Sequence, residues 1–320
     1  MDLHLLVDNL TNPALLFFFL GLLVVFLKSD LEIPANSSKF IALYLLFSIG
    51  FKGGQELSHS EIDLEILWSL LFGVLLALSV PCYAFILLRK KLGVFNAGAI
   101  AAAYGSVSAV TFVTAVSFLD LQGMEFGGHM VAVMALMEAP SIIIGVLLIS
   151  WYQSSQGKTE SCSGVLKHAV TNGSVLLIIG SLAIGFLSSD AQAEGIKPFT
   201  TDIFQGFLAV FLLDMGITSG KKLNSLFSNG WEPLLFAMLV PLFNGSVVAI
   251  VSNWISDTEG NRFLFAILAA SASYIAVPAA MKLAAPKANP SLYIPMALAI
   301  TFPLNITIGM PLYLSIIRMY

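Results

Sequence analysis

One carboxylate stands out because it lies in a long apolar stretch, VMALMEAPSIIIGVLL, near the centre of a predicted membrane span. Glu138 has no Lys or Arg in that span, so its charge is costly unless it is protonated, paired or bound to a cation. Pro140 leaves the carbonyl of Leu136 without its helical donor. These oxygens, with nearby hydroxyls, suit a hard cation, and sodium or a proton is the expected guest. The alternative is a structural Glu, neutral or hydrogen-bonded between helices.

Two clusters of small and hydroxyl residues could complete such a site. The first, AAYGSVSAVT, begins at Ala102, and the second, AASASYIAVP, begins at Ala269. Gly, Ser and Pro tolerate a broken helix. Amides at half-helix N-termini favour an anion, and freed carbonyls and hydroxyls favour a small cation. The alternative is that small residues let helices pack closely, with each Ser bonded within its own helix.

A second carboxylate, Asp214, lies in the apolar stretch FLLDMGITSGKK. One interpretation is an ion pair with Lys52. The other, which we favour, is a structural or snorkelling role, because both residues lie toward span ends. Cys82 and Cys162 have no His or Cys partner at metal spacing, and the sequence contains no nucleophile elbow or P-loop. We therefore expect neither an enzyme nor a bound cofactor.

Composition places these residues in a membrane. Of 320 residues, 58% are hydrophobic and 11% charged, and the mean hydropathy is +0.89. Soluble domains carry roughly a quarter charged residues, so a soluble globular protein, a disordered chain and a nucleic-acid binder are excluded. The apolar runs predict an all-α polytopic membrane protein. We predict ten spans, near residues 10–28, 36–54, 66–88, 96–118, 129–152, 170–188, 200–219, 233–254, 262–284 and 291–317.

The charges predict an orientation. Most Lys and Arg residues fall in alternate connectors, and the remaining connectors are rich in Asp and Glu. Because basic connectors stay in the cytoplasm, both termini are predicted to lie outside a bacterial inner membrane.

The two halves of the chain resemble one another. GFKGGQEL at Gly50 matches GITSGKKL at Gly216, and the two hydroxyl clusters match at nearly the same offset. MALMEAP at Met134 also resembles MALAITFP at Met296. With five spans in each half, the second half would enter the membrane inverted, as in many secondary transporters. The predicted organisation is a first repeat at 1–152, a cytoplasmic linker at 153–169 and an inverted second repeat at 170–320.

Several motifs together resemble the sodium-dependent bicarbonate permease family (SbtA type). They are KGG after span two, YGSVSAVT, the carboxylate followed by x-P in span five, AASASYIAVP, and NPSLY within KANPSLYIPMALAITFPLNITIGMPL. The resemblance implies a ten-span inverted repeat with a core domain and a gate domain, assembled as a homotrimer. It also implies uptake of bicarbonate with sodium as coupling ion, and a cytoplasmic PII-like regulator.

The resemblance also implies site residues. Cyanobacterial members carry Ser-Ser-Ser-Asp where this chain has Ser271 to Tyr274, and Asp where it has Glu138. Bicarbonate would lie between the breaks of spans four and nine, and sodium would lie beside it. The implied bicarbonate residues are Tyr104, Gly105, Ser106, Ala272 and Ser273, and the implied sodium ligands are Ser108, Thr111, Glu138 and Ser271.

The sequence-based hypothesis is a sodium-coupled bicarbonate symporter that works by alternating access. The core, made of spans three to five and eight to ten, would move against spans one, two, six and seven. Two alternatives remain open. One is a sodium or proton symporter of another small anion on the same fold. The other is a membrane enzyme or a sensor that does not transport.

Overall fold

A computed structural model describes residues 3–59, 63–154, 173–227 and 230–320, and every regular element within these ranges is a helix. The first half of the chain contains α1 (Leu3–Leu10), α2 (Pro13–Phe26), α3 (Ala35–Ser58), α4 (Leu64–Gly105), α5 (Ala109–Leu121) and α6 (His129–Ser154). The predicted linker lies outside the described residues from position 155 onward.

The second half is also helical and ends in one continuous, irregular column. It contains α8 (Gly173–Leu187), α9 (Asp190–Lys197), η1 (Pro198–Asp202), α10 (Phe204–Phe227), α11 (Glu232–Val251), η2 (Ser252–Trp254), α12 (Glu259–Ala270) and α13 (Ala276–Ala284). The column consists of α14 (Pro290–Pro295), η3 (Met296–Thr301), α15 (Phe302–Leu304), η4 (Asn305–Gly309) and α16 (Met310–Ile317). Its η3 and η4 segments are π-helical. This form of helix is rare overall, and where it occurs it is often near a functional site.

Five helical stretches of the described chain are long and apolar enough to cross a membrane, so this is a multi-pass membrane protein. Every predicted span range contains a helix, but the count of ten crossings and the inverted arrangement remain predictions. The five stretches are Leu64–Leu121, His129–Tyr152, Asp190–Leu223, Glu232–Trp254 and Pro290–Ile317, and two shorter apolar helices are Pro13–Phe26 and Val175–Leu187.

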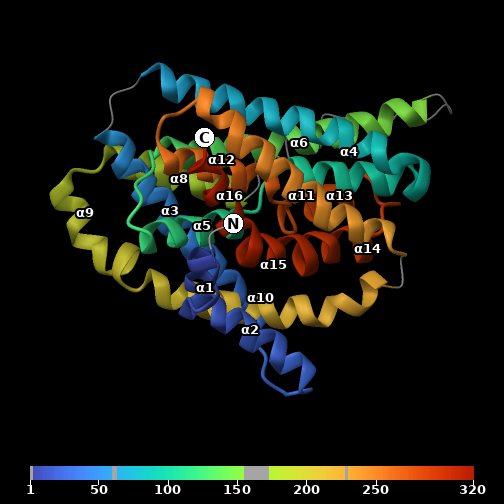
Figure 1. Cartoon of the computed structure of the whole chain (residues 1–320), viewed down its shortest axis with the longest axis horizontal. Coiled ribbons are helices and arrows are strands. Elements are labelled where there is room, and N and C mark those ends of the chain that lie inside the picture. The colour runs from blue at the N-terminus through green and yellow to red at the C-terminus, as the bar shows by residue number, and fades with distance from the viewer. Residues whose placement is uncertain (1–2, 60–62, 155–172, 228–229) are drawn as a thin grey trace.

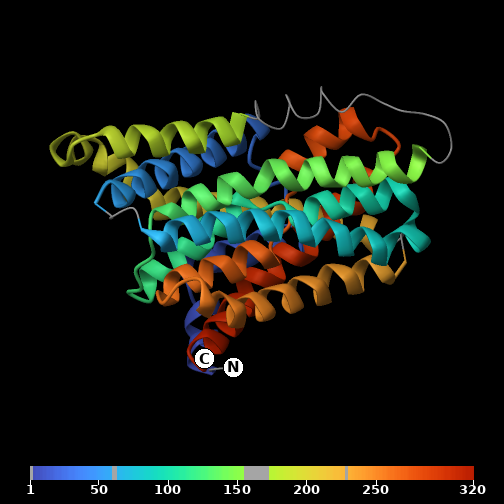
Figure 2. The ribbon, with the colours of Figure 1, turned by 90° about the horizontal axis from the view of Figure 1, so that it is seen from above.

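The long helices run beside one another along the longest axis of the molecule (Figures 1 and 2). Within α4 the chain reverses at Gly93, which has φ 78° and ψ 162°, a backbone conformation that favours glycine. The reversal separates a helix over 64–92 from one over 94–105, at the boundary between predicted spans three and four. The helix α6 packs along α4. The helices α11 and α12 pack against each other and against α16 of the final column.

Two further helix pairs pack backbone against backbone. A Cβ atom added to Gly21 of α2 or to Gly216 of α10 would collide with main-chain atoms of the other helix. The same holds for Gly54 of α3 and Gly185 of α8. Glycines allow such close approach of helices in membranes, where dispersion contacts replace the hydrophobic effect. The pairs α2–α10 and α3–α8 therefore form tightly joined units beside the central helices.

Candidate functional site

Both hydroxyl clusters interrupt their helices, as the sequence predicts. The first break separates α4, which ends at Gly105, from α5, which begins at Ala109. The second separates α12, which ends at Ala270, from α13, which begins at Ala276. Each break leaves one half-helix C-terminus, which presents free carbonyls, and one half-helix N-terminus, which presents free amides.

The two breaks contact each other directly, although they lie far apart in the sequence. The backbone N–H of Ser273 donates to the carbonyl of Ala103 at 2.8 Å. The N–H of Ser108 donates to Oγ of Ser271 at 3.1 Å, and Ser108 Oγ accepts from the N–H of Thr111 at 3.2 Å. The predicted site residues of the two halves are thus brought into one crossing.

Polar side chains from neighbouring helices donate hydrogen bonds to the carbonyls at the C-terminal end of α12. Asn244 of α11 donates to the carbonyl of Ala269 at 3.2 Å, and Asn305 of η4 donates to that of Ala270 at 2.7 Å. Ser141 of α6 donates in the same way to Ala102 in the first half, at 3.0 Å. Each Asn also accepts a hydrogen bond from a tyrosine hydroxyl, that of Tyr83 for Asn244 (2.6 Å) and that of Tyr313 for Asn305 (3.1 Å).

These capping residues were missed by the sequence reasoning. The signal that could have found them is a polar amide in an apolar run, as in PLFNGSVV around Asn244 and FPLNITIG around Asn305. A buried carbonyl without a donor costs about 1–3 kcal/mol, so these bonds stabilise the broken helix ends. Three carbonyls at the two breaks therefore already accept a side-chain hydrogen bond, whereas the carboxylate and hydroxyl oxygens that line the cavity are open to a cation.

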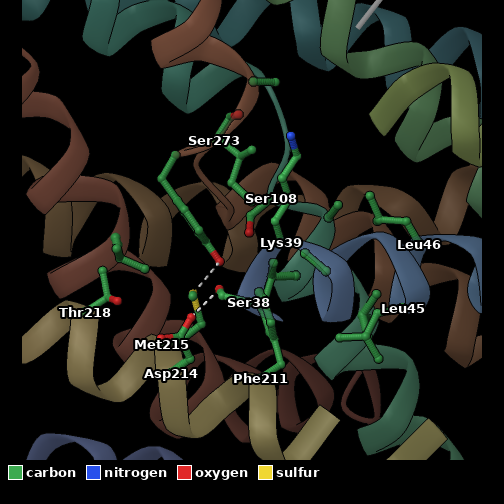
Figure 3. Close-up of a pocket in the computed structure, with 18 of the residues that line it drawn as sticks. Ser38, Lys39, Leu45, Leu46, Ser108, Phe211, Asp214, Met215, Thr218 and Ser273 are labelled. Carbon is green, nitrogen blue, oxygen red and sulfur yellow. Dashed lines mark hydrogen bonds between the residues drawn. The ribbon is translucent and has the colours of Figure 1, made fainter. Parts of the chain in front are cut away.

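A cavity of about 500 Å³ opens beside the crossing. Its walls come from α3, the first break, α6, α10, the second break and the final column. Among the predicted site residues, Ser108, Glu138 and Ser273 line it. Figure 3 shows Ser108 and Ser273 on one side, with Asp214 and Met215 of α10 on the other. The cavity therefore presents two carboxylates and several hydroxyls to one space.

The remaining predicted residues lie behind the cavity wall. The Tyr104 hydroxyl bonds to Thr301 at 2.8 Å, and a Cβ on Gly105 would collide with Pro81 and Ser141. Both residues pack the crossing rather than face the cavity. Thr111, Ser271 and Ala272 are also buried there, at exposed fractions of 1%, 1% and 2%.

Glu138 has the environment expected of an ion ligand. Its side chain is 4% exposed, and its Oε1 has no hydrogen-bond partner among the described residues. Ser106 Oγ at the first break is also buried without a partner in that part of the chain. An unpaired buried carboxylate oxygen is costly, and a bound cation or proton would remove that cost.

Lys52 does not pair with Asp214, so the less favoured of the two interpretations of Asp214 is wrong. Lys52 Nζ lies 3.4 Å from Oδ1 of Asp120, near the other end of α3. Asp214 instead accepts a hydrogen bond from Ser38, also on α3. From its position in the sequence, Asp214 was expected only to lie near the end of a span. In the structure Asp214 lines the cavity.

The sequence profile of the Na+-dependent bicarbonate transporter superfamily matches residues 13–318. The chain belongs to this superfamily. The family resemblance drawn from the motifs is therefore confirmed, and membership is in keeping with a transporter rather than an enzyme. No curated protein shows significant similarity to the chain.

Proposed function

We propose that this protein is a sodium-coupled bicarbonate symporter, with sodium held at Glu138 and bicarbonate at the crossing of the two breaks. The observation that carries the proposal is the buried Oε1 of Glu138, which has no hydrogen-bond partner in the described part of the chain. Glu138 lines a cavity beside two half-helix N-termini. Ser108 is the residue that caps α5, so its hydroxyl and the first amides of α5 are close to the same space. Superfamily membership supplies the ion and the substrate class.

Electrostatics would couple the two solutes. An ionised Glu138 repels an incoming anion, and sodium removes that repulsion. At a separation of about 6 Å and an effective dielectric constant of about 20, two unit charges repel by about 3 kcal/mol. That energy corresponds to roughly a 100-fold change in anion affinity. Bicarbonate would therefore bind poorly until sodium is in place.

Half-helix amides would hold the anion. The chain resumes helical structure at Ala109 and at Ala276, and both residues line the cavity. Exposed amides at a helix N-terminus carry partial positive charge and suit a bicarbonate oxygen. Ser273 Oγ, which accepts from the N–H of Val277 at 3.4 Å, can donate its own proton to the same oxygen.

Alternating access would move the crossing against α3 and α10, which form the opposite cavity wall. Lys39 and Lys222 line the cavity and fall in predicted cytoplasmic connectors or span ends, which supports an inward-open state. The core and gate domains, the inverted repeats, the homotrimer, the PII-like regulator and the bacterial inner membrane, with both termini outside, rest on the sequence and the family resemblance.

Uptake of labelled bicarbonate into proteoliposomes tests the proposal. We expect a sodium gradient to drive uptake, and choline to fail in its place. Glu138→Gln should abolish sodium-driven accumulation, whereas Glu125→Gln, an exposed control, should behave as wild type. Sodium-independent uptake, or full competition by formate or acetate, would show that another small anion or another coupling is used.

A further inference from the structure

The second carboxylate in the cavity is not used by the mechanism above. Asp214 lies in an apolar stretch of α10 and is 8% exposed, yet it lines the same cavity as Glu138. Figure 3 shows its side chain beside that of Ser38, with Met215 next to it. A carboxylate within a membrane span that faces a cavity is expected to be functional rather than structural, because its desolvation is otherwise uncompensated.

One hydroxyl donates to this carboxylate, and others line the same cavity. Ser38 of α3 donates to Asp214, and Thr218, one helical turn further along α10, also lines the cavity. The Tyr274 hydroxyl lies 3.7 Å from Sδ of Met215, the residue that follows Asp214. Ser108 also interacts with this hydroxyl. Because the hydroxyl donates its proton to the thioether, lone pairs of the Tyr274 oxygen remain available to a cation.

The two Lys residues that line the cavity lie away from Asp214, and Lys221, seven residues or about 10 Å further along α10, attracts this carboxylate from outside the cavity lining. Lys222 is eight residues further along α10, or about 12 Å of helix. The amine of Lys39 points away from Asp214 in Figure 3. A carboxylate with neutral hydroxyls is an all-oxygen ligand set of net charge −1, which a monovalent hard cation neutralises.

We propose that Asp214, Ser38 and Tyr274 form a second sodium site, distinct from Glu138, that is filled in each transport cycle. This inference rests on the proposed function. The two carboxylates stand on different walls, Glu138 on α6 and Asp214 on α10. Sodium at Glu138 leaves the charge of Asp214 facing the anion, and a second sodium ion neutralises it. Two sodium ions with one bicarbonate carry one net positive charge per cycle.

The response of bicarbonate uptake to membrane potential reveals the net charge that each transport cycle moves. In proteoliposomes with equal sodium on both sides, an inside-negative potential set by potassium and valinomycin should drive wild-type bicarbonate uptake. One charge moved through 100 mV corresponds to about 50-fold accumulation. Asp214→Asn should still take up bicarbonate with a sodium gradient, but it should not respond to potential, and its Hill coefficient for sodium should fall from near two to near one.

Asp202→Asn is the matched control, because Asp202 is exposed on η1, earlier in the same helical stretch, and lies outside the cavity. It should keep the wild-type response to potential. If Asp214→Asn keeps that response and the wild-type Hill coefficient, the second site is refuted. If Glu138→Gln retains sodium-driven uptake, the proposed function fails instead, so the two failures are distinguishable.

A measurement of sodium binding tests the second site even if the Asp214→Asn variant folds but does not transport. The melting temperature of the purified protein should rise with sodium, and the rise per tenfold increase in sodium reflects the number of sites. Asp214→Asn should show about half the wild-type slope, with potassium or choline as the reference salt. An unchanged slope, or a wild-type response that sodium does not cause, would overturn the second sodium site.

Discussion

Asn305 provides the sharpest test of how the broken helix is held. Its amide donates to the carbonyl of Ala270, the last residue of α12, and accepts from the hydroxyl of Tyr313. The residue is fully buried. In Asn305→Ala the Tyr313 hydroxyl keeps the carbonyl of Pro241 as a partner, at 3.3 Å, whereas the carbonyl of Ala270 loses its side-chain donor.

The magnitude follows from these contacts. One buried carbonyl without a donor costs about 1–3 kcal/mol, and the small cavity left by the amide adds about 1 kcal/mol. The total of about 2–4 kcal/mol corresponds to a fall of roughly 3–6 °C in melting temperature for a chain of this length. Thermal unfolding in detergent, followed by tryptophan fluorescence, measures it.

Thr307→Val is the matched control. The Thr307 hydroxyl donates to the carbonyl of Pro303 within its own helical column, at 2.6 Å, so its loss should change the melting temperature little. Asn305→Ala and Tyr313→Phe should be non-additive when combined, because the two side chains share a bond. Equal effects of Asn305→Ala and Thr307→Val would refute the capping argument.

Three further changes have expected outcomes. Ser271→Ala removes the acceptor of the Ser108 N–H and should raise the sodium concentration for half-maximal uptake, with a stability loss of about 1–3 kcal/mol seen in the melting temperature. Gly105→Ala overpacks the crossing, so we expect a loss of about 1–3 kcal/mol and slower uptake, and a wild-type melting temperature would contradict the packing described above. Lys91→Ala breaks an exposed ion pair with Glu232, of 2.7 Å, and should cost less than about 1 kcal/mol by the same melting assay.

Much of the site could be predicted because its signals are local. A short stretch of sequence is enough to recognise a carboxylate in an apolar run, or Gly, Ser and Pro residues in the middle of a span. Both breaks lie where the two hydroxyl clusters lie, and Glu138 faces a cavity beside them. The contact between Ser108 and Ser271 follows once two broken spans cross.

The remaining features depend on packing between distant segments. Nothing near Asn305 in the sequence indicates that it meets Ala270, because the bond requires the final column to lie against α12. Asp214 was interpreted as structural for the same reason, since only the placement of α10 against α3 turns it toward the cavity. Six of the predicted site residues pack the crossing instead of lining the cavity, a distinction that residue type does not encode.

The glycine contacts between α2 and α10 have a mechanical consequence. Where Gly21 and Gly216 meet, main chain touches main chain, so no side chain can change rotamer to let one helix slip past the other. The two helices should therefore move together as one rigid body, and Asp214, which lies on α10, should move with them. A pair of spin labels on α2 and α10 should then keep one distance in every state, while a pair on α10 and α6 should show two.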